Sequence, residues 1–353
     1  MIRWHHLLLV LSAASLAALS TPARAVELSD RQVVETLTTD APRDVAIRKG
    51  LEFLRARQRP DGSLTDNVPS ALASLAAMAH LAAGHTADDT LHGAWLKRSI
   101  DYVLSKQDEN GYFGAKDASR MYGHGIDCLM LAEALGMCRD EDLEERIRSA
   151  LERAVAVTVN ASLVKKEPFF QGGWRYTPED ATSDLSLSGW QLMSLHAAQQ
   201  VGITVPDAVM TGAIEFAKRL TTPDGKVGYD HAGDDHAPLR GLSMLCFAIG
   251  HQEQASEMAR IAARIQADPL QWQGAWFFYR AYYDAVGMSR GSPESWDAYA
   301  PIFEKVLIEH QNPDGSWPNP PGDDEGGQGP VYMTSMAVLA LAVQRHVLPA
   351  YQR

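Results

Sequence analysis

A short pattern recurs along this chain at intervals of roughly 40 to 60 residues, the spacing of helical repeat proteins. The three clearest copies place an apolar residue, a glutamine and a glycine in the same spacing: Phe53, Gln58 and Gly62; Tyr102, Gln107 and Gly111; Val306, Gln311 and Gly315. A fourth copy keeps Phe216 and Gly225 but has Thr221 where the others have glutamine, and two looser copies contain the turn glycines Gly173 and Gly274. A period of this length predicts units that are stable only when packed against one another.

Each copy predicts two helices. An amphipathic helix, with apolar residues about 3.6 positions apart, ends at the glycine turn, and a far more apolar helix follows it, most clearly at 70–84 and 334–346. A helix that is apolar on nearly all sides must be buried on nearly all sides. We therefore predict an all-α fold, a closed (α/α)6 toroid with six amphipathic helices outside six apolar ones. An open solenoid would need polar caps, and the apolar segment 334–346 argues against one.

The first 25 residues have the pattern of a secretory signal peptide. Arg3 supplies the positive charge, Leu7 to Leu19 the apolar stretch, and Ala23-Arg24-Ala25 the cleavage site. The apolar run is shorter than the about 18 residues of a membrane anchor, and no later segment reaches that length. We therefore predict cleavage near Ala25, export to the periplasm or the extracellular space, and one toroid domain over residues 26–353.

Charge and cysteine content restrict the partners of the chain. Cleavage would remove two basic side chains, Arg3 and Arg24, and no acidic ones, which leaves 30 basic against 44 acidic side chains and a net charge of −14. Such a surface repels phosphate backbones, so we predict no nucleic-acid partner. Cys128, Cys138 and Cys246 are odd in number and fall in or at predicted helices, which favours buried thiols over a disulfide framework, although one bridge stays open.

The repeats resemble QW-type motifs, and the chain resembles the prenyltransferase/squalene-cyclase repeat superfamily. The likeness is nearest to the small, secreted, single-toroid cyclase-like proteins of bacteria. It is carried by residues 121–137 ("MYGHGIDCLMLAEALGM"), 172–198 and 332–353, and it extends over essentially the whole mature chain. The resemblance implies the (α/α)6 toroid and a central cavity for an apolar or isoprenoid-type small molecule.

The resemblance also implies where a proton donor would stand. Triterpene cyclases of the superfamily protonate their substrate with the middle Asp of a D-x-D-D motif, roughly ten residues after a G-G-W. Here Asp184 follows Trp174 by ten residues, and Ser186 and Leu187 occupy the next two acid positions. A serine hydroxyl cannot act as an acid of that strength, and no other D-x-D-D occurs. The implied reading is a retained fold without the donor.

The prenyltransferase branch of the superfamily holds zinc through Asp, Cys and His. Asp127 and Cys128 are adjacent here, so on a helix they point about 100° apart and do not readily bind one ion. His124 and Asp127 share a helix face, and His231 or His236 could complete a site with them. No nucleophile elbow, metalloprotease motif or phosphate-binding loop is present. We predict neither a metal site nor a cofactor.

Aromatic and acidic residues gather where the predicted inner helices begin. In a toroid these starts converge on one mouth of the central cavity, so the rings could line it; they are Trp174, Trp190, Tyr279, Tyr282, Tyr283 and Tyr332. Packing in the turns is the alternative, which we favour for Trp174 and Trp317. Glu179, Asp180 and Asp184 could form the acid pair of a carbohydrate-active toroid or a solvated turn. Residues 318–330 could be a lid or a surface insertion.

Three functional hypotheses remain open. The favoured one is binding of an apolar or isoprenoid ligand, or of a partner, in the cavity. The second is a divergent terpene cyclase or a metal-dependent prenyl-transfer relative, and the third is a non-catalytic interaction scaffold with a filled core. Whether the protein is an enzyme is left open, and the candidate pocket residues are His124, Asp127, Asp184, Ser186, His236 and Tyr332.

Overall fold

The computed structural model describes residues 41–345 and residue 348, and the compact unit begins at Ala41. The predicted signal peptide, residues 1–25, lies outside the described residues. The part of the chain that is described contains twelve α-helices and no strand. The outer helices are α2 (Pro42–Arg57), α4 (Gly93–Lys106), α6 (Glu141–Ser162), α8 (Asp207–Arg219), α10 (Ser256–Ala267) and α12 (Pro293–Glu309). The inner helices are α3 (Pro69–Ala82), α5 (Arg120–Met137), α7 (Leu185–Gln200), α9 (Arg240–Ile249), α11 (Phe277–Ser289) and α13 (Gly329–Ala342).

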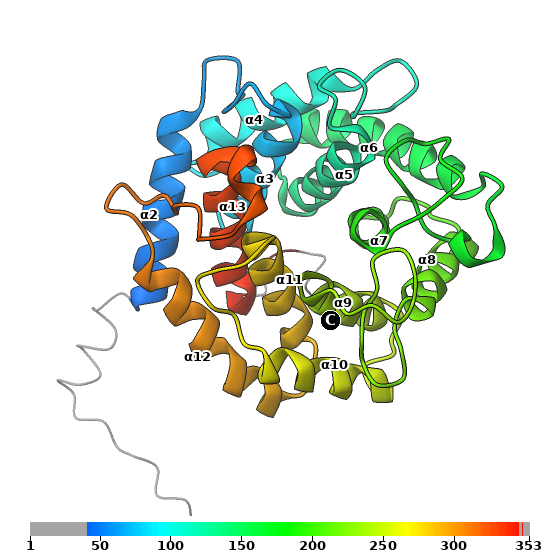
Figure 1. Ribbon diagram of the computed structural model, residues 1–353. Coiled ribbons are helices and arrows are strands. Elements are labelled where there is room, and N and C mark those ends of the chain that lie inside the picture. The colour runs from blue at the N-terminus through cyan, green and yellow to red at the C-terminus, as the bar shows by residue number, and fades with distance from the viewer. Residues whose placement is uncertain (1–40, 346–347, 349–353) are drawn as a thin grey trace, which may run out of the picture. The chain divides into compact units, whose positions relative to one another are not determined.

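The two sets of helices form two concentric rings within this unit (Figure 1). The last inner helix, α13, packs against α11 on one side and against α3 on the other, and it also contacts α2. The first and last repeats are therefore neighbours, and the ring is closed. The predicted all-α (α/α)6 toroid is confirmed.

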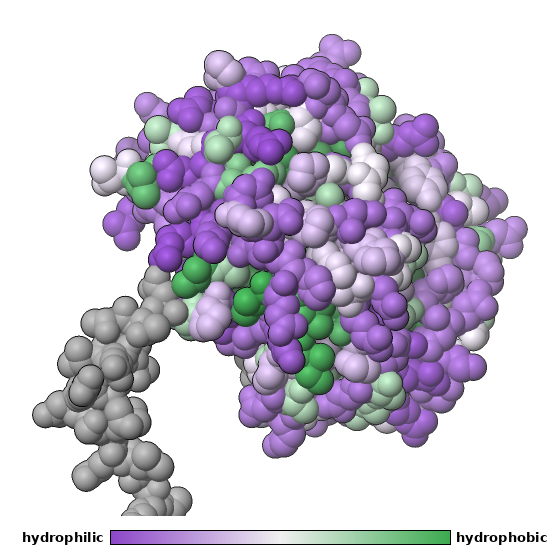
Figure 2. Space-filling view, turned by 60° about the vertical axis from the view of Figure 1, so that its left-hand side comes forward, coloured by the Kyte–Doolittle hydropathy of each residue, from purple (hydrophilic) through white to green (hydrophobic). Residues whose placement is uncertain are grey.

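Burial follows the sequence pattern of each ring. In the inner helix α3 every side chain from Ser70 to Ala82 is buried. In the outer helix α10 only Met258, Ile261, Ala262 and Ile265 are buried, a spacing that marks one helix face. The opposite faces of the outer helices are polar, and Figure 2 shows an exterior dominated by hydrophilic side chains with small apolar patches.

The inner ring depends on close backbone contact at one pair of helices. A Cβ atom on Gly241 of α9 would lie 2.1 Å from the Tyr283 carbonyl oxygen of α11, and one on Gly287 would lie 2.3 Å from the Gly241 carbonyl oxygen. No real Cβ makes such contacts, so only glycine permits α9 and α11 to approach this closely.

The repeated glutamines join neighbouring outer helices. Each one ends an outer helix and donates a hydrogen bond from Nε2 to a backbone carbonyl of the next outer helix. The last bond leads from the end of α12 to α2 and so fastens the two ends of the ring. The three bonds are Gln58 to Trp95 O at 2.9 Å, Gln107 to Ala150 O at 2.7 Å, and Gln311 to Ala46 O at 2.9 Å.

One turn glycine differs from the prediction. In the third repeat Gly172, not Gly173, adopts the left-handed conformation, with φ of 86°. Gly173 instead packs where a Cβ would lie 2.6 Å from atoms of both Phe216 and Ser183. Gly172 therefore makes the turn, and Gly173 leaves space for the neighbouring side chains.

The turn tryptophans are structural. Trp174 and Trp317 are at most 1% exposed, and their indole N–H groups donate to Thr158 O at 2.8 Å and Leu307 O at 2.7 Å. Cys128 and Cys246 are buried free thiols and Cys138 is a half-buried one, as the cysteine pattern favoured. Among the described helices, none is both long and apolar enough to cross a bilayer.

Candidate functional site at the mouth of the toroid

All six inner helices run in the same direction, so their N-terminal ends meet at one end of the ring, which we call the mouth. Three hydroxyl groups from three inner helices are linked there. The Tyr122 hydroxyl of α5 and Ser186 Oγ of α7 share a hydrogen bond of 2.7 Å, and Ser186 Oγ and the Tyr279 hydroxyl of α11 share another of 2.9 Å. Ser186 therefore bridges α5 and α11. We call these three residues the hydroxyl triad.

Aromatic rings of α7 and α11 pack against one another one helical turn below the triad. Trp190 of α7 lies stacked on Tyr282 of α11 with ring centroids 6.1 Å apart, and edge-on to Tyr283 at 5.7 Å. All three side chains are at most 2% exposed. We call these three buried rings the aromatic floor.

Asp184 is a buried carboxyl group at the edge of the mouth. It caps α7, because its Oδ1 accepts a hydrogen bond from the Leu187 N–H at 2.8 Å. Its Oδ2 lies 3.5 Å from Arg175 Nε. Burial raises the pKa of Asp184 to about 6, although the Leu187 N–H and the Arg175 charge both lower it. Desolvation is therefore the dominant influence, and the carboxyl is a weak acid poised near neutrality.

Two loops build an aromatic wall beside Asp184. The guanidinium of Arg175, from the segment before α7, lies 5.3 Å from the ring centroid of Tyr176 and 5.4 Å from that of Tyr229. Cations at such distances from ring faces are attracted to them. The Tyr176 and Tyr229 hydroxyls share a hydrogen bond of 2.9 Å, and Arg175 also pairs with Asp230 at 3.3 Å. The segment before α7 and the loop between α8 and α9 are thereby fastened together.

Glu325 anchors the segment 318–330 across the opposite side of the mouth. Its carboxylate accepts hydrogen bonds from the Phe278 and Tyr279 N–H groups at 2.7 and 3.2 Å, and from the Tyr332 hydroxyl at 2.5 Å. An anion is favourable at this helix N-terminus, yet burial raises the pKa of Glu325 to about 7. The short helix η3 (Asp324–Gln328) is therefore tied to α11 and α13.

Backbone strain also concentrates at the mouth. Among the described residues five non-glycine residues have positive φ, and four of them lie where inner helices begin: Val68 before α3, Ala118 and Arg120 at α5, and Trp276 before α11. A β-branched residue such as Val68, with φ of 36°, is a genuine outlier in this region. Such strain costs on the order of 1–3 kcal/mol per residue and clusters at functional sites. Its position favours the mouth as the functional end.

The structure brings three of the six candidate residues together at the mouth: Asp184, Ser186 and Tyr332. His236 lies exposed on the loop between α8 and α9, with its ring centroid 6.3 Å from that of Tyr229. It therefore stands at the rim rather than inside.

His124 and Asp127 lie within the wall of the ring. His124 Nδ1 accepts from the Phe113 N–H at 3.3 Å, and its Nε2 lies 3.1 Å from Ala154 O, so this neutral imidazole faces the outer helix α6. Asp127 Oδ1 accepts from Ser74 Oγ at 2.6 Å and joins α5 to α3. Across residues 41–345, no three His, Cys, Asp or Glu side chains are arranged to hold a metal ion.

The sequence pattern did not single out five residues of the mouth: Tyr122, Arg175, Tyr176, Tyr229 and Glu325. Tyr122 could have been found, because it occupies the first turn of a predicted inner helix, where the other mouth aromatics were expected. The other four sit in irregular segments, where no periodicity indicates the direction of a side chain.

Comparisons with known proteins agree on the fold. No protein-family model matches the sequence, and no curated protein does. The apo structure of the type II terpene cyclase MstE from Scytonema is similar with a TM-score of 0.57 at 14% identity, over 87% of this chain and 99% of that chain. A glycosidase variant is similar with a TM-score of 0.56 at 12% identity, over 91% and 100%. A protein from Actinoplanes gives 0.53 at 16% identity, over 88% and 100%.

The chain therefore has the helical-toroid fold that the terpene cyclase and the glycosidase also have. Identities this low show the fold alone. The finer resemblance to the prenyltransferase/squalene-cyclase repeat superfamily stays a prediction from the sequence.

Proposed function

We propose that this protein binds an apolar, isoprenoid-type small molecule at the mouth of the toroid and does not cyclise it. The hydroxyl triad carries the proposal. Ser186 links Tyr122 and Tyr279 from three inner helices, and the aromatic floor lies directly below. A ligand with a hydroxyl or similar polar end would hydrogen-bond the triad and lay its apolar part against the partly exposed rings of Tyr176 and Tyr229 in the aromatic wall, as small-molecule sites usually combine the two.

The acidity of the mouth argues for binding over cyclisation. Protonating an alkene requires an unusually strong acid, and a raised pKa makes a carboxyl a weaker one. Asp184 has a pKa of about 6, and Glu325 has a pKa of about 7 with its carboxylate occupied by three donors. The neutral Ser186 stands in the middle acid position of the resembled motif. Positioned general acids contribute about 10²–10⁴-fold, and this mouth offers no strong one.

A structural neighbour supports the ligand class. A variant of MstE is similar to this chain with a TM-score of 0.56 at 15% identity, and that protein holds geranylgeranyl dihydroxybenzoate as its substrate. This molecule joins an apolar isoprenoid chain to a polar head. We propose the same combination of apolar chain and polar head for the ligand here.

We further propose that the protein acts after export. The signal-peptide pattern of residues 1–25 supports this, because Arg3, the apolar stretch and the A-x-A site occur in the required order. Fractionation of an expressing bacterium tests it. Mature protein in the periplasm or medium that begins near residue 26 is the expected result, and full-length protein retained in the cytoplasm would contradict it.

Lipid capture followed by mass spectrometry tests the binding function. The purified protein is incubated with squalene, geranylgeraniol and a membrane lipid extract, re-isolated and extracted with organic solvent. We expect one isoprenoid to be enriched at unchanged mass and retention. Ser186→Ala should lower its capture about fivefold or more, because the bridge that orients the two tyrosine hydroxyls is lost at a cost of about 1 kcal/mol or more.

Ser105→Ala is the matched control, since Ser105 Oγ bonds only its own outer helix, at Tyr102 O. It should capture as much lipid as the unaltered protein. A product of equal mass but shifted retention would identify an isomerising cyclase. If neither protein retains any lipid, the scaffold hypothesis replaces the binding one.

A further inference from the structure

The loop between α8 and α9, residues 221–236, forms one wall of the mouth. The Tyr229 carbonyl accepts a hydrogen bond from the Leu185 N–H at 2.8 Å, directly beside Asp184. Tyr229 and Asp230 supply the contacts with Tyr176 and Arg175 described above. A displacement of this loop would therefore uncover Asp184 and dismantle the aromatic wall.

Little apolar packing holds this loop in place. Between residues 222 and 236 the only buried non-glycine side chain is Val227, and the segment is otherwise half-buried or exposed. Segments with few buried apolar contacts open at low free energy. The position of the loop must then depend largely on polar contacts.

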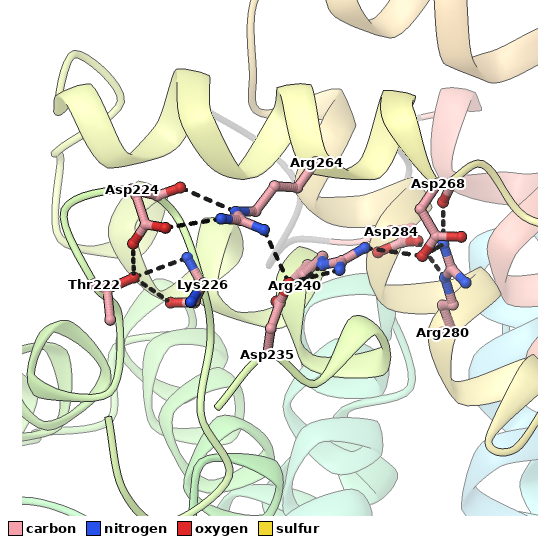
Figure 3. Close-up of polar contacts among 9 residues, drawn as sticks. All are labelled: Thr222, Asp224, Lys226, Asp235, Arg240, Arg264, Asp268, Arg280 and Asp284. Atoms are coloured by element: carbon pink, nitrogen blue, oxygen red, sulfur yellow. Dashed lines mark hydrogen bonds and ion pairs between the residues drawn. The ribbon is translucent and has the colours of Figure 1, made fainter. Parts of the chain in front are cut away.

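Arginines of α9 and α10 supply several further polar contacts to the loop (Figure 3). Arg264 of α10 reaches Asp224 with Nη2 at 2.9 Å and Asp235 with Nη1 at 3.0 Å. Arg240 of α9 holds the same Asp235 with Nη2 at 2.8 Å and Nε at 3.2 Å. Arg260 donates to Pro223 O at 2.7 Å. Arginine guanidinium groups therefore bind both ends of the loop, at Pro223 and Asp224 and at Asp235.

The ion pairs continue from the loop into the inner ring. Arg240 Nη1 also binds Asp268 at 3.0 Å, Asp268 binds Arg280 at 3.2 Å, and Arg280 Nε binds Asp284 at 3.2 Å. Asp284 is fully buried on α11, next to Tyr283 of the aromatic floor. The row of alternating charges in Figure 3 thus connects the wall of the mouth with the helix that carries its floor.

We propose that residues 221–236 are a movable wall of the proposed binding site, held closed by this row of ion pairs, with Arg264 as a positioning residue. The biological purpose of this motion rests on the proposed binding function, whereas the motion itself needs no ligand.

The ion pairs differ in strength along the row. The Asp224 side chain is 56% exposed, so salt screens its pair with Arg264, whereas the Arg240 side chain is 10% exposed and its pair with Asp235 is screened much less. The wall therefore opens from the Asp224 end.

Hydrogen–deuterium exchange of the ligand-free, full-length chain tests the wall. Peptides within residues 221–236 should exchange faster as NaCl is raised from low to high concentration, with the larger increase at residues 221–228. In Arg264→Gln the same peptides should exchange roughly tenfold faster already at low salt, because two ion pairs and the hydrogen bond from Arg264 Nε to Asp224 O at 2.9 Å are lost together. Peptides of α4 and α6 should not change.

Two further variants make the result specific. Arg264→Lys keeps the charge but cannot reach both aspartates, so it should restore protection at one end of the loop only. Arg146→Gln breaks an exposed pair with Asp101 on α6 and α4 and should leave the loop unchanged. Exchange in residues 221–236 that is independent of salt and of Arg264 would overturn the proposal. Lipid capture that fails while this exchange pattern holds would reject the binding function alone.

Discussion

Two polar clusters, one at each end of the toroid, are built from groups of opposite kinds. The cluster at the mouth contains the buried carboxyls Asp184 and Glu325, set among tyrosines. The cluster at the far end, where α3 finishes, consists of imidazoles: buried His80 lies stacked on Trp95 at 4.1 Å, and half-buried His85 on His92 at 3.6 Å. Burial favours the neutral form of both kinds. It raises the pKa of Asp184 and Glu325 to about 6 and 7, and lowers that of His80 and His92 to about 3 and 4.

The difference lies in what the polar groups touch. The imidazoles pack against one another and against an indole, and His85 Nδ1 lies 3.0 Å from Asp89 Oδ2. The carboxyls border a hydroxyl triad, strained helix starts and half-exposed tyrosines. With the binding site that we propose at the mouth, residues for packing and residues for recognition would lie at opposite ends of the ring.

The largest expected effect concerns the far end. Trp95→Ala should lower the free energy of unfolding by about 3–5 kcal/mol, since a 4% exposed indole is removed and its His80 partner loses its support. Urea unfolding measures the loss, and the folded fraction should still capture lipid at the mouth. Leu91→Ala, on a 64% exposed neighbour, should change stability by less than about 0.5 kcal/mol. Loss of capture in the folded Trp95→Ala fraction would mean that the two ends are coupled.

The next effect is acid sensitivity from His80. The unfolded imidazole takes up a proton near pH 6.5, whereas the folded one does so only near pH 3. This contribution to stability is therefore complete above pH 6.5 and declines as pH falls toward 3, by on the order of 2–4 kcal/mol. His80→Gln should flatten the decline in urea titrations between pH 7 and pH 4. His231→Gln, on an exposed side chain, should leave it in place.

The smallest effect has the opposite pH dependence and comes from Glu325. The folded carboxyl releases its proton near pH 7 but the unfolded one already near pH 4.5, so folding becomes less favourable as pH rises between these values. The expected loss is about 1–3 kcal/mol. Glu325→Gln cannot ionise and should lack this loss in the same titrations. If it behaves like the unaltered protein between pH 4.5 and 7, the buried carboxylate is not the cause.

The ring was predictable from sequence and the mouth only in part, for physical reasons. The recurring glutamines and glycines, such as Gln58 and Gly62, encode local contacts between consecutive helices, so periodicity reveals them. Asp184 and Ser186 were found through their spacing from Trp174. Glu325 was not, because its role arises only when an irregular segment folds back onto α11. The choice of Gly172 over Gly173 for the turn likewise depends on Phe216, a neighbour from another repeat.

The hydrogen bond from Gln311 to Ala46 O has a consequence for how the molecule forms. It spans 265 positions of the chain, while Gln58 and Gln107 reach only 37 and 43 positions ahead. Contacts of long sequence separation carry a larger loop-closure entropy and form late in folding. The contact between α12 and α2 is therefore the last contact between outer helices to form. Until it closes, the apolar sides of α13 and α3 face water, and this interval is when the chain is most exposed to aggregation.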